Sequence, residues 1–224
     1  MNAEALLAFL AASLTLGTAA QGTLQNLDFE QANPIFISYG VATTASAMPY
    51  WTVTIAGVQQ TEIGVNEFTI GAPGVSLVGP GSTVFGPIDG NYSVVLQNYG
   101  TAAYASISQT GMIPDGSQSL LFEARPPIAP APSGPLDIQI GNQTVSYMQV
   151  GSGPNYAIYA ANISAWAGQA ETLTISDPYL GGNWELDDIT FSPNAVVPEP
   201  NPLFLTGLGS ALLGLYRRYM IRKQ

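Results

Sequence analysis

Short runs of alternating apolar and polar residues fill the middle of this 224-residue chain. Residues 51–55 read WTVTI, residues 136–140 read LDIQI and residues 172–176 read TLTIS. Alternation with a period of two predicts β-strands that are buried on one face only. Turn residues such as 88–91 (IDGN) and 114–116 (PDG) separate the runs, because glycine, asparagine and aspartate favour reversal of the chain. Runs of the same kind occupy residues 92–96 and 119–123.

The regular spacing of strands and turns, with no long helical pattern between them, predicts an all-β fold: an antiparallel two-sheet β-sandwich over residues 23–195. The composition agrees, since the chain holds 24 glycines and 17 prolines but only five lysines and arginines. The proline-rich run 125–135 (RPPIAPAPSGP) cannot lie inside a sheet. It is either a linker between two small domains or, as we expect, a long loop within one sandwich.

The residue types that the chain lacks exclude most kinds of active site. It has no cysteine and no histidine, which rules out disulfides, Ser-His-Asp triads and ordinary zinc or copper sites. Between Thr23 and Val197 the only basic residue is Arg125, against thirteen acidic residues, so nucleic acid is not an expected partner. We expect a protein that is not an enzyme. Carboxylate-based glycan hydrolysis is the alternative, and no spacing selects a pair among the candidates Glu30, Glu62, Glu67, Asp89, Glu123, Glu185, Asp187 and Asp188.

The first 22 residues have the form of a secretory signal peptide. An apolar run from Ala5 to Leu16 is followed by small residues at 18–20 (TAA). No lysine or arginine precedes the run, and Glu4 stands there instead, so a buried N-terminal helix is the alternative. We expect residues 1–22 to form a helical signal that directs export.

Residues 196–224 combine three elements in a fixed order. A Pro-Glu-Pro motif interrupts regular structure, Leu203 to Tyr216 is uncharged and mostly apolar, and a basic cluster follows at 217–223. The apolar run is shorter than the about 20 residues of a spanning helix, but it lengthens if Met220 and Ile221 enter the membrane while the arginines snorkel. Basic residues beyond such a helix stay on the cytoplasmic side, which leaves the acidic domain outside.

This order resembles the PEP-CTERM sorting signal of Gram-negative bacteria, and the matching residues are Pro198, Glu199, Pro200, Arg217 and Arg218. The resemblance implies that an exosortase, a membrane transpeptidase, recognises the tail and cuts it near the Pro-Glu-Pro motif. It also implies that a C-terminal hydrophobic helix holds the protein in the inner membrane before processing. The protein then passes to the cell surface or the extracellular matrix, alongside exopolysaccharide. A permanent C-terminal anchor is the alternative and gives nearly the same topology.

Three landmarks mark out the domain between the two ends. Residues 26–30 (NLDFE) open it, residues 89–96 (DGNYSVVL) follow Trp51, and residues 184–191 (WELDDITF) close it. This order resembles the galactose-binding-like jelly rolls, which include several carbohydrate-binding modules. The resemblance implies a jelly-roll sandwich with an opening strand at 26–30 and a closing strand at 184–191.

Asp187 and Asp188 face opposite sides of an extended strand, so one of them points inward whichever face is buried. A buried carboxylate needs a partner. Arg125 is the only cation of the domain, and a calcium ion or turn amides near 181–183 (GGN) are the alternatives. In the jelly-roll family a structural calcium often joins the first-strand Phe-Glu to the last-strand Asp. The resemblance therefore implies calcium held by Glu30 and by Asp187 or Asp188.

Sugar binding needs exposed aromatic faces beside hydrogen-bonding groups. Trp51 and Trp184 open strand-like runs, so we expect them in the core. Tyr99, in the loop-like sequence NYG, and Trp166 are the candidate ligand-binding residues. The sequence thus predicts an exported surface or matrix protein that contacts polysaccharide or mediates adhesion. A structural surface-coat protein without a specific ligand is the second reading, and a glycan hydrolase is the third.

Overall fold

The computed structural model describes residues 22–67, 74–83, 86–98, 104–125, 134–178 and 182–196. The expected signal peptide and sorting tail lie outside these residues, apart from Gly22 and the segment up to Val196. Within the described ranges, no helix has the length and apolar character needed to cross a membrane. The expectations for the two ends of the chain, including both helices, therefore stay predictions.

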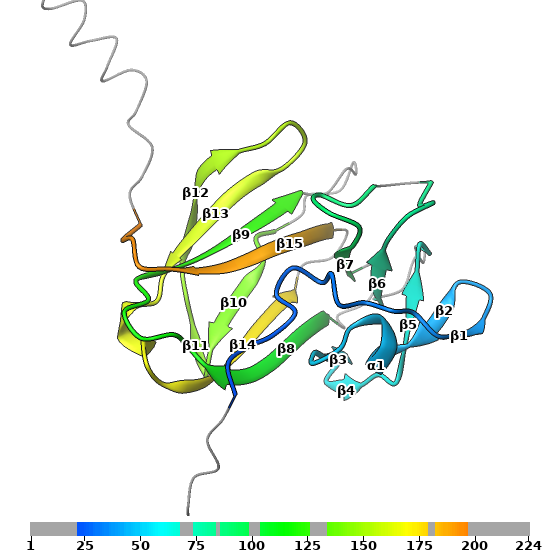
Figure 1. Cartoon of the computed structure of the whole chain (residues 1–224), viewed down its shortest axis with the longest axis horizontal. Coiled ribbons are helices and arrows are strands. Elements are labelled where there is room, and N and C mark those ends of the chain that lie inside the picture. The colour runs from blue at the N-terminus through cyan, green and yellow to red at the C-terminus, as the bar shows by residue number, and fades with distance from the viewer. Residues whose placement is uncertain are drawn as a thin grey trace, which may run out of the picture.

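Two sheets make up most of the described chain (Figure 1). In these residues the larger sheet has nine strands, in the order β1-β2-β5-β6-β7-β15-β9-β13-β12. They are β1 (Phe36–Ser38), β2 (Val41–Thr43), β5 (Glu62–Val65), β6 (Gly74–Val78), β7 (Ser93–Asn98), β9 (Ser119–Arg125), β12 (Tyr147–Ser152), β13 (Ala157–Asn162) and β15 (Gly182–Ser192).

The smaller sheet has six strands in the described residues, in the order β11-β10-β14-β8-β3-β4. A short helix precedes β3 and a 3₁₀ turn precedes β14. The elements are α1 (Thr44–Ala47), β3 (Thr52–Ile55), β4 (Val58–Gln59), β8 (Ala105–Met112), β10 (Asp137–Ile140), β11 (Gln143–Thr144), η1 (Ser164–Trp166) and β14 (Ala170–Asp177).

The prediction of an all-β, two-sheet fold is confirmed, but the sheets are not purely antiparallel. β5 runs parallel to β6, with Gly64 opposite Ser76. The chain leaves β5 at Asn66, whose backbone is left-handed with a φ of 56°. The Asn66 side chain accepts the N–H of Gly79 at 2.8 Å and donates to the carbonyl of Pro80 at 3.2 Å, which ties together the ends of the two strands. Alternation in the sequence predicts which residues are buried but not which way a strand runs.

The five alternating runs of the sequence are all strands, namely β3, β7, β9, β10 and β14. The expected and observed boundaries differ by at most two residues. The expected turn at 114–116 is present between β8 and β9, where the N–H of Ser117 donates to the carbonyl of Pro114 at 3.2 Å. Gly116 takes a φ of 74°, a conformation in which glycine has no side chain to clash.

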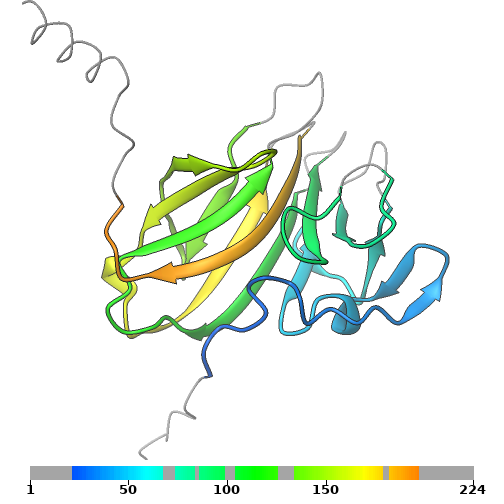
Figure 2. The same ribbon diagram turned by 45° about the horizontal axis from the view of Figure 1, so that its top comes forward.

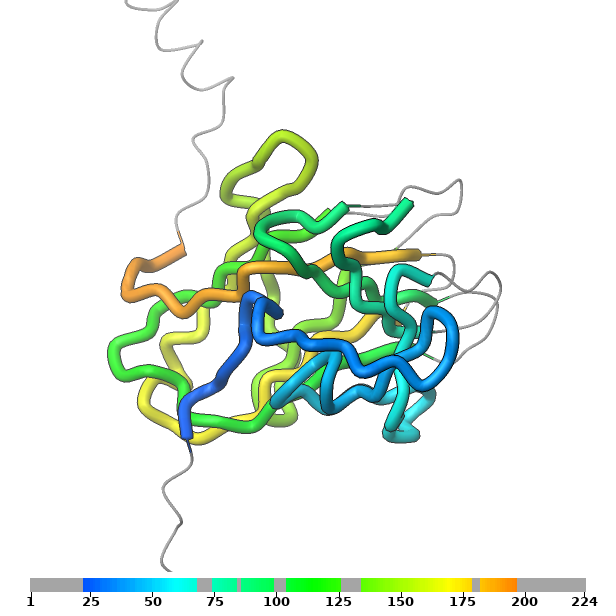
Figure 3. The backbone as a smooth tube through the Cα atoms, turned by 45° about the vertical axis from the view of Figure 1, so that its right-hand side comes forward, coloured from blue at the N-terminus to red at the C-terminus, as the bar shows by residue number. Residues whose placement is uncertain are grey.

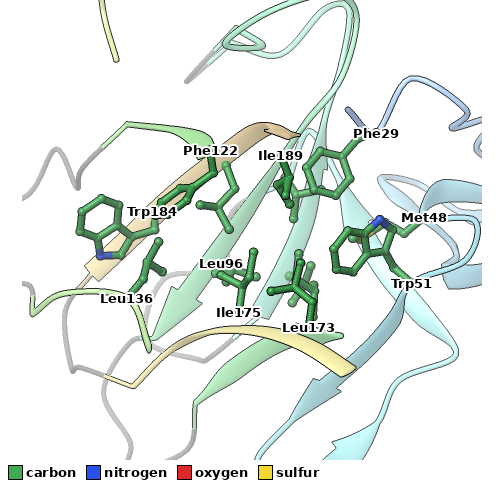
Figure 4. Packing of buried hydrophobic residues seen from close by; sticks show 14 of the residues in the cluster. Phe29, Met48, Trp51, Leu96, Phe122, Leu136, Leu173, Ile175, Trp184 and Ile189 are labelled. Carbon is green, nitrogen blue, oxygen red and sulfur yellow. The ribbon is translucent and has the colours of Figure 1, made fainter. Parts of the chain in front are cut away.

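A continuous hydrophobic cluster lies between the two sheets (Figure 4). Leu96, Phe122 and Ile189 enter it from the nine-stranded sheet, while Leu173 and Ile175 enter it from the six-stranded sheet. Each fully buried side chain of this size stabilises the fold by about 1.5–3 kcal/mol relative to its exposed state. The alternating sequence thus forms a sandwich because each sheet has one apolar face to cover.

Trp51 and Trp184 are buried in this cluster, as expected. The indole N–H of Trp51 donates to the carbonyl of Asn26 at 2.9 Å, and that of Trp184 donates to the carbonyl of Gly134 at 3.1 Å. Phe29 packs on Trp51 with ring centroids 5.6 Å apart. Both tryptophans therefore connect the core to segments outside the strands, and neither presents a free aromatic face.

The ends of the described chain and the β1–β2 hairpin lie on opposite sides of the molecule (Figure 2). In this view the orange end of the described chain, after β15, is on the left, its blue start is at the lower left, and the hairpin is at the far right. The turned view agrees with this placement (Figure 3). A segment attached to either end therefore starts on the side away from the hairpin.

Candidate functional site

The three sequence landmarks meet around the turn at 88–92, which leads into β7. Glu30 Oε1 accepts the backbone N–H groups of Asn91 at 2.7 Å and Tyr92 at 2.8 Å, and its Oε2 accepts the side-chain amide of Asn91 at 2.9 Å. From the other side, Asp187 Oδ2 accepts the N–H of Asp89 at 3.1 Å. We call Glu30 and Asp187 the carboxylate clamp, because together they fix this turn to β15.

The opening landmark is a turn and not the strand that the resemblance implied. Asn26 and Phe29 have left-handed backbones, with φ of 50° and 58°. The side chain of Asn26 accepts the N–H of Gln31 at 2.9 Å, and the carbonyl of Leu27 accepts the N–H of Ile189 at 3.0 Å. Local hydrogen bonds of an asparagine favour such a turn over a strand. This turn places Glu30 beside β7.

Asp187 is the aspartate that points inward, since it is only 2% exposed while Asp188 is exposed. The register of β15 against β9 shifts between Asp187 and Thr190, and Asp188 has a left-handed φ of 44°. A β-bulge of this kind re-aims side chains. Arg125 does not pair with Asp187; its Nη1 lies 2.8 Å from Glu185 Oε2. Asp187 is instead satisfied by amides, those of Asp89 and, at 2.8 Å, of Asp188.

The two carboxylates of the clamp are electrostatically different. Burial raises the pKa of Asp187 to about 8, against the lowering effect of the N–H groups of Asp89 and Asp188, and the nearby charges of Asp188 and Glu30 add to the rise. Burial also raises the pKa of Glu30, but its hydrogen bonds from Asn91 and Tyr92 outweigh this and hold the pKa below its ordinary value.

The carboxylate oxygens that calcium would need in the clamp already have hydrogen-bond partners. Glu30 Oε1 accepts two N–H groups, whereas Glu30 Oε2 and the two oxygens of Asp187 accept one each. A cation would have to use the second lone pair of these three oxygens or displace the N–H groups. Across the described ranges, no group of three or more Asp, Glu, His or Cys side chains is placed to hold a metal ion. The calcium site of Glu30 with Asp187 or Asp188 stays a prediction.

Of the two predicted ligand-binding residues, Tyr99 lies outside the described residues. Trp166 is in η1, between β13 and β14, where it is half-buried and packs against the hydrophobic cluster. Its backbone N–H donates to the carbonyl of Ile163 at 2.9 Å. Trp166 therefore contributes to the edge of the core, and neither residue is placed in a described ligand site.

A different surface gathers groups that suit a sugar. On the six-stranded sheet, Val53, Ile107 and Leu173 point into the core, so the residues between them point to the outer face. These outward residues are almost all hydroxylic, and we call this surface the hydroxyl face. Its members are Thr52, Thr54, Ser106, Ser108, Thr110, Thr172, Thr174 and Ser176.

Strand register arranges these hydroxyls in rows across the sheet. In one row Thr54 pairs with Ser106, which pairs with Ser176 on the far side. Asp137 of β10 extends this row beyond Ser176. The spacing between neighbours in a row is the strand spacing of about 4.8 Å. Some hydroxyls bond to each other across the strands, as Thr54 does with Ser106.

The next row repeats the pattern. Thr52 pairs with Ser108, Ser108 pairs with Thr174, and Gln139 of β10 continues the row. Gln139 Nε2 donates to Asp137 Oδ2 at 2.5 Å, which fixes the acceptor and donor groups at the β10 end of the two rows. Ser106 and Ser176 are buried, so the more open groups of the two rows, such as Thr174 and Gln139, are the ones that can exchange hydrogen bonds with a polyhydroxylated chain.

A hollow of about 350 Å³ lies over this end of the hydroxyl face. Tyr104, which is exposed, borders it at the start of β8, and Pro178 borders it at the end of β14. The remaining lining is polar and comes from Thr54, Ser106, Asp137, Gln139, Thr174 and Ser176. An aromatic ring beside hydroxyl, carboxylate and amide groups is the combination expected of a sugar site.

Sequence reasoning missed this face although its residues were visible in the alternating runs. The pattern showed that Thr and Ser alternate with apolar residues over 52–55 and 172–176. It did not show that these strands both flank β8, because pairing between distant strands is not encoded in local periodicity. The accumulation of Thr and Ser on one side of three strands was the available signal.

Comparisons with known proteins assign the chain to no family. No family model matches it, and no curated protein matches it. Among solved structures it is similar to the enzymatically active domain of tailspike protein 4 of bacteriophage CBA120, with 12% identity, 77% of this chain and 21% of that chain covered, and a TM-score of 0.39. It is also similar to the secreted serine protease VesC of Vibrio cholerae, with 8% identity, 74% and 44% covered, and a TM-score of 0.34. The chain thus spans less than half of either structure, and these similarities carry no conclusion about its function.

Proposed function

We propose that the chain is an exported, non-catalytic surface or matrix protein whose jelly-roll-type sandwich contacts extracellular polysaccharide through the hydroxyl face. The observation that carries the proposal is the hollow of about 350 Å³ in which Tyr104, Asp137 and rows of Thr and Ser meet. The acidic charge of the chain, −10 overall, disfavours polyanions and leaves neutral or cationic polysaccharides as the ligand class.

The physical basis is a fixed pattern of many weak contacts. Hydrogen bonds from sheet side chains contribute about 0.5–1.5 kcal/mol each, and an aromatic ring adds apolar contact with a sugar ring. Because the sheet holds these groups rigid, little conformational entropy is lost on binding. Affinity for a single sugar would be weak, and affinity for a polymer that follows the rows would be higher.

The test is a polysaccharide array probed with the full chain in mild detergent, with Tyr104→Ala and Thr174→Val as site variants. Thr174→Val keeps the β-branched shape and removes only the hydroxyl. We expect saturable binding to a neutral or cationic polymer, about tenfold weaker for Tyr104→Ala, which corresponds to about 1.4 kcal/mol. A smaller loss is expected for Thr174→Val.

The matched control is Tyr50→Asn, which removes an exposed aromatic ring away from the hollow. Tyr50 has a φ of 72°, a conformation that asparagine tolerates. Unchanged binding of this variant would show that the hollow, and not exposed aromatics in general, is the site. If the chain is folded but binds no polysaccharide, the remaining interpretation is a structural surface-coat protein without a specific ligand.

The sorting tail belongs to the same proposal. The sequence order of Pro198-Glu199-Pro200, an apolar run and Arg217-Arg218 supports recognition by an exosortase-type transpeptidase and release from the inner membrane to the surface or matrix. The intact mass of the protein recovered from its producing cells tests this. We expect a mass that lacks residues 217–224. A mass that includes them would leave only a permanent membrane anchor.

A further inference from the structure

The β1–β2 hairpin presents bulky apolar side chains to solvent. Ile35 is 63% exposed, Phe36 59%, Ile37 49% and Tyr39 94%. We call residues 35–41 the apolar hairpin. Isolated exposed apolar residues are normal, but a contiguous group marks an interaction surface. In the described residues, most of the strongly exposed large apolar side chains fall within 31–61.

The hairpin is also free of charge. No Asp, Glu, Lys or Arg occurs from residue 31 to residue 61, in a chain whose net charge is −10. Two acidic residues border the hairpin: Glu62 on β5, and Glu67, which approaches Gly40 in the turn between β1 and β2. Two copies of so acidic a protein repel each other over most of their surfaces, and this repulsion is weakest where both surfaces are neutral.

β1 forms one edge of the nine-stranded sheet in the described chain. Its register against β2 shifts between Phe36 and Ser38, so Ile37 lies at a bulge. Edge strands expose backbone N–H and C=O groups that can pair with another chain, and a bulge limits such pairing to a short stretch. This edge therefore suits a closed contact with one partner better than an extended ladder of strands.

We propose that the apolar hairpin packs against the apolar hairpin of a second copy of this chain about a two-fold axis. A two-fold contact uses the same patch on both copies, so a neutral apolar patch is complementary to itself. The hairpin lies on the side opposite the two ends of the described chain, so two copies joined here keep these ends apart (Figure 2).

Other occupants fit less well. A membrane surface would favour basic residues around the apolar group, and the hairpin is bordered by Glu62 and Glu67. A polysaccharide would require more hydrogen-bonding side chains than the hairpin offers, since Ile35, Phe36 and Ile37 have none.

The size of the patch predicts a weak dimer. Four large side chains per copy, at roughly 100–200 Å² each, bury about 1,000 Å² in total with their neighbours, near the lower limit of specific interfaces. A hollow of about 320 Å³ beside the hairpin, lined by Gly40, Val41 and Ile63 together with Glu62 and Glu67, can receive Tyr39 of the other copy. Tyr39 then acts as the aromatic anchor of the contact.

The experiment is sedimentation velocity of the full chain in mild detergent over a concentration series, with Ile37→Lys and Ile37→Glu. A two-fold axis through the hairpin brings the charge introduced on one copy close to the identical charge on the other copy. We expect a concentration-dependent dimer for the unaltered chain and at least tenfold weaker association for each variant. An equimolar mixture of the two variants should associate again, because opposite charges then meet.

The matched control is Met148→Lys, which adds the same charge on β12, the opposite edge of the same sheet. Met148→Lys should leave the dimer unchanged. The apolar C-terminal tail is the same in all samples, so it does not account for a difference between them. Melting curves check that the variants fold. If the two Ile37 variants do not fold, Tyr39→Lys and Tyr39→Glu take their place. A monomer at all concentrations, a dimer that survives both charges, a mixture that stays monomeric, or a loss caused by Met148→Lys would each overturn the proposal.

Discussion

Glu30 and Asp187 hold the same turn by opposite electrostatic means. Glu30 reaches the turn from a partly exposed position, and hydrogen bonds hold its pKa below the ordinary value. Asp187 reaches it from inside β15, where burial raises its pKa to about 8. Glu30 thus stabilises the turn at high pH, where it is ionised, whereas Asp187 stabilises it at low pH, where it is protonated.

Replacing Glu30 tests its part in the clamp. Glu30→Ala removes the acceptor for three N–H groups of Asn91 and Tyr92, so we expect the free energy of unfolding to fall by about 2–3 kcal/mol. Glu30→Gln keeps one acceptor oxygen and should cost less. Urea unfolding of both variants measures this, with Glu62→Ala as an exposed acidic control. Equal stability of Glu30→Ala and the unaltered protein would show that the turn does not depend on this carboxylate.

The raised pKa of Asp187 predicts how the free energy of unfolding depends on pH. Its pKa is raised in the fold, so its contribution is full below the unfolded pKa of about 4 and is lost as pH rises through about 8. We expect the free energy of unfolding, and with it the melting temperature, to fall between pH 5 and pH 8. This group contributes at most about 1.4 kcal/mol per pH unit to the fall in free energy. Asp188, Glu123 and Glu185 have raised pKa values and add to the same trend. In Asp187→Asn the slope should be smaller, and a melting temperature that rises over this range would contradict the assignment.

Calcium gives a separate prediction for the same carboxylates. If Glu30 and Asp187 bound the ion, calcium would replace the proton on Asp187 and stabilise the fold by mass action. Because both carboxylates already accept N–H groups, we expect melting curves at pH 8 to coincide in calcium and in chelator. A higher melting temperature in calcium, lost in Glu30→Gln, would instead support the ion that the family resemblance implies.

At the scale of the element, the sequence predicted the strands better than their pairing. The runs at 51–55 and 172–176 became β3 and β14 because period two survives in any sheet. Two features were not predictable from that period. β5 lies parallel to β6, and the bulge at Asp188 buries Asp187 next to Leu186 on the same strand. Both depend on contacts between segments far apart in the chain, as does the hydroxyl face.

Arg125 and Glu185 link β9 to β15, so replacing either residue should destabilise both strands. Glu185 is 3% exposed, and Ser93 also donates to it at 3.0 Å. Arg125→Met leaves a buried carboxylate without its cation, so we expect a loss of about 3–5 kcal/mol at pH 8. Burial raises the pKa of Glu185 against the opposing effect of Arg125, so the loss should shrink at pH 5 as the carboxyl group is protonated.

The double variant Arg125→Met with Glu185→Gln separates the charge from the packing. It should recover much of the stability at pH 8, since no unpaired charge is then buried and the glutamine carbonyl still accepts from Ser93. Chemical unfolding at both pH values compares the single variant, the double variant and the unaltered protein. Equal stability of the single and double variants would mean that the packing of the arginine stem or its hydrogen bonds to the carbonyls of Asn155 and Gly86, and not its ion pair with Glu185, account for the loss.

At the scale of the whole molecule, the two proposed surfaces belong to different sheets. The hydroxyl face lies on the six-stranded sheet, and the apolar hairpin is an edge of the nine-stranded sheet. A dimer formed through the hairpins would therefore carry two hydroxyl faces, neither of them covered by the contact. Two weak sites joined in this way bind a polymer more strongly than either site alone, because the second binding event is intramolecular.

This arrangement predicts that long and short ligands distinguish the contributions of the two surfaces to binding. Ile37→Lys should reduce retention on an immobilised polysaccharide by about tenfold or more, because the dimer is lost, yet leave binding to a short soluble fragment unchanged. Tyr104→Ala should weaken both, because it changes the site itself. Surface plasmon resonance on the polymer, paired with calorimetry on the fragment, distinguishes these cases. If Ile37→Lys weakened fragment binding as much as polymer binding, the hairpin would belong to the sugar site, and the division of the molecule into a binding face and an association edge would be wrong.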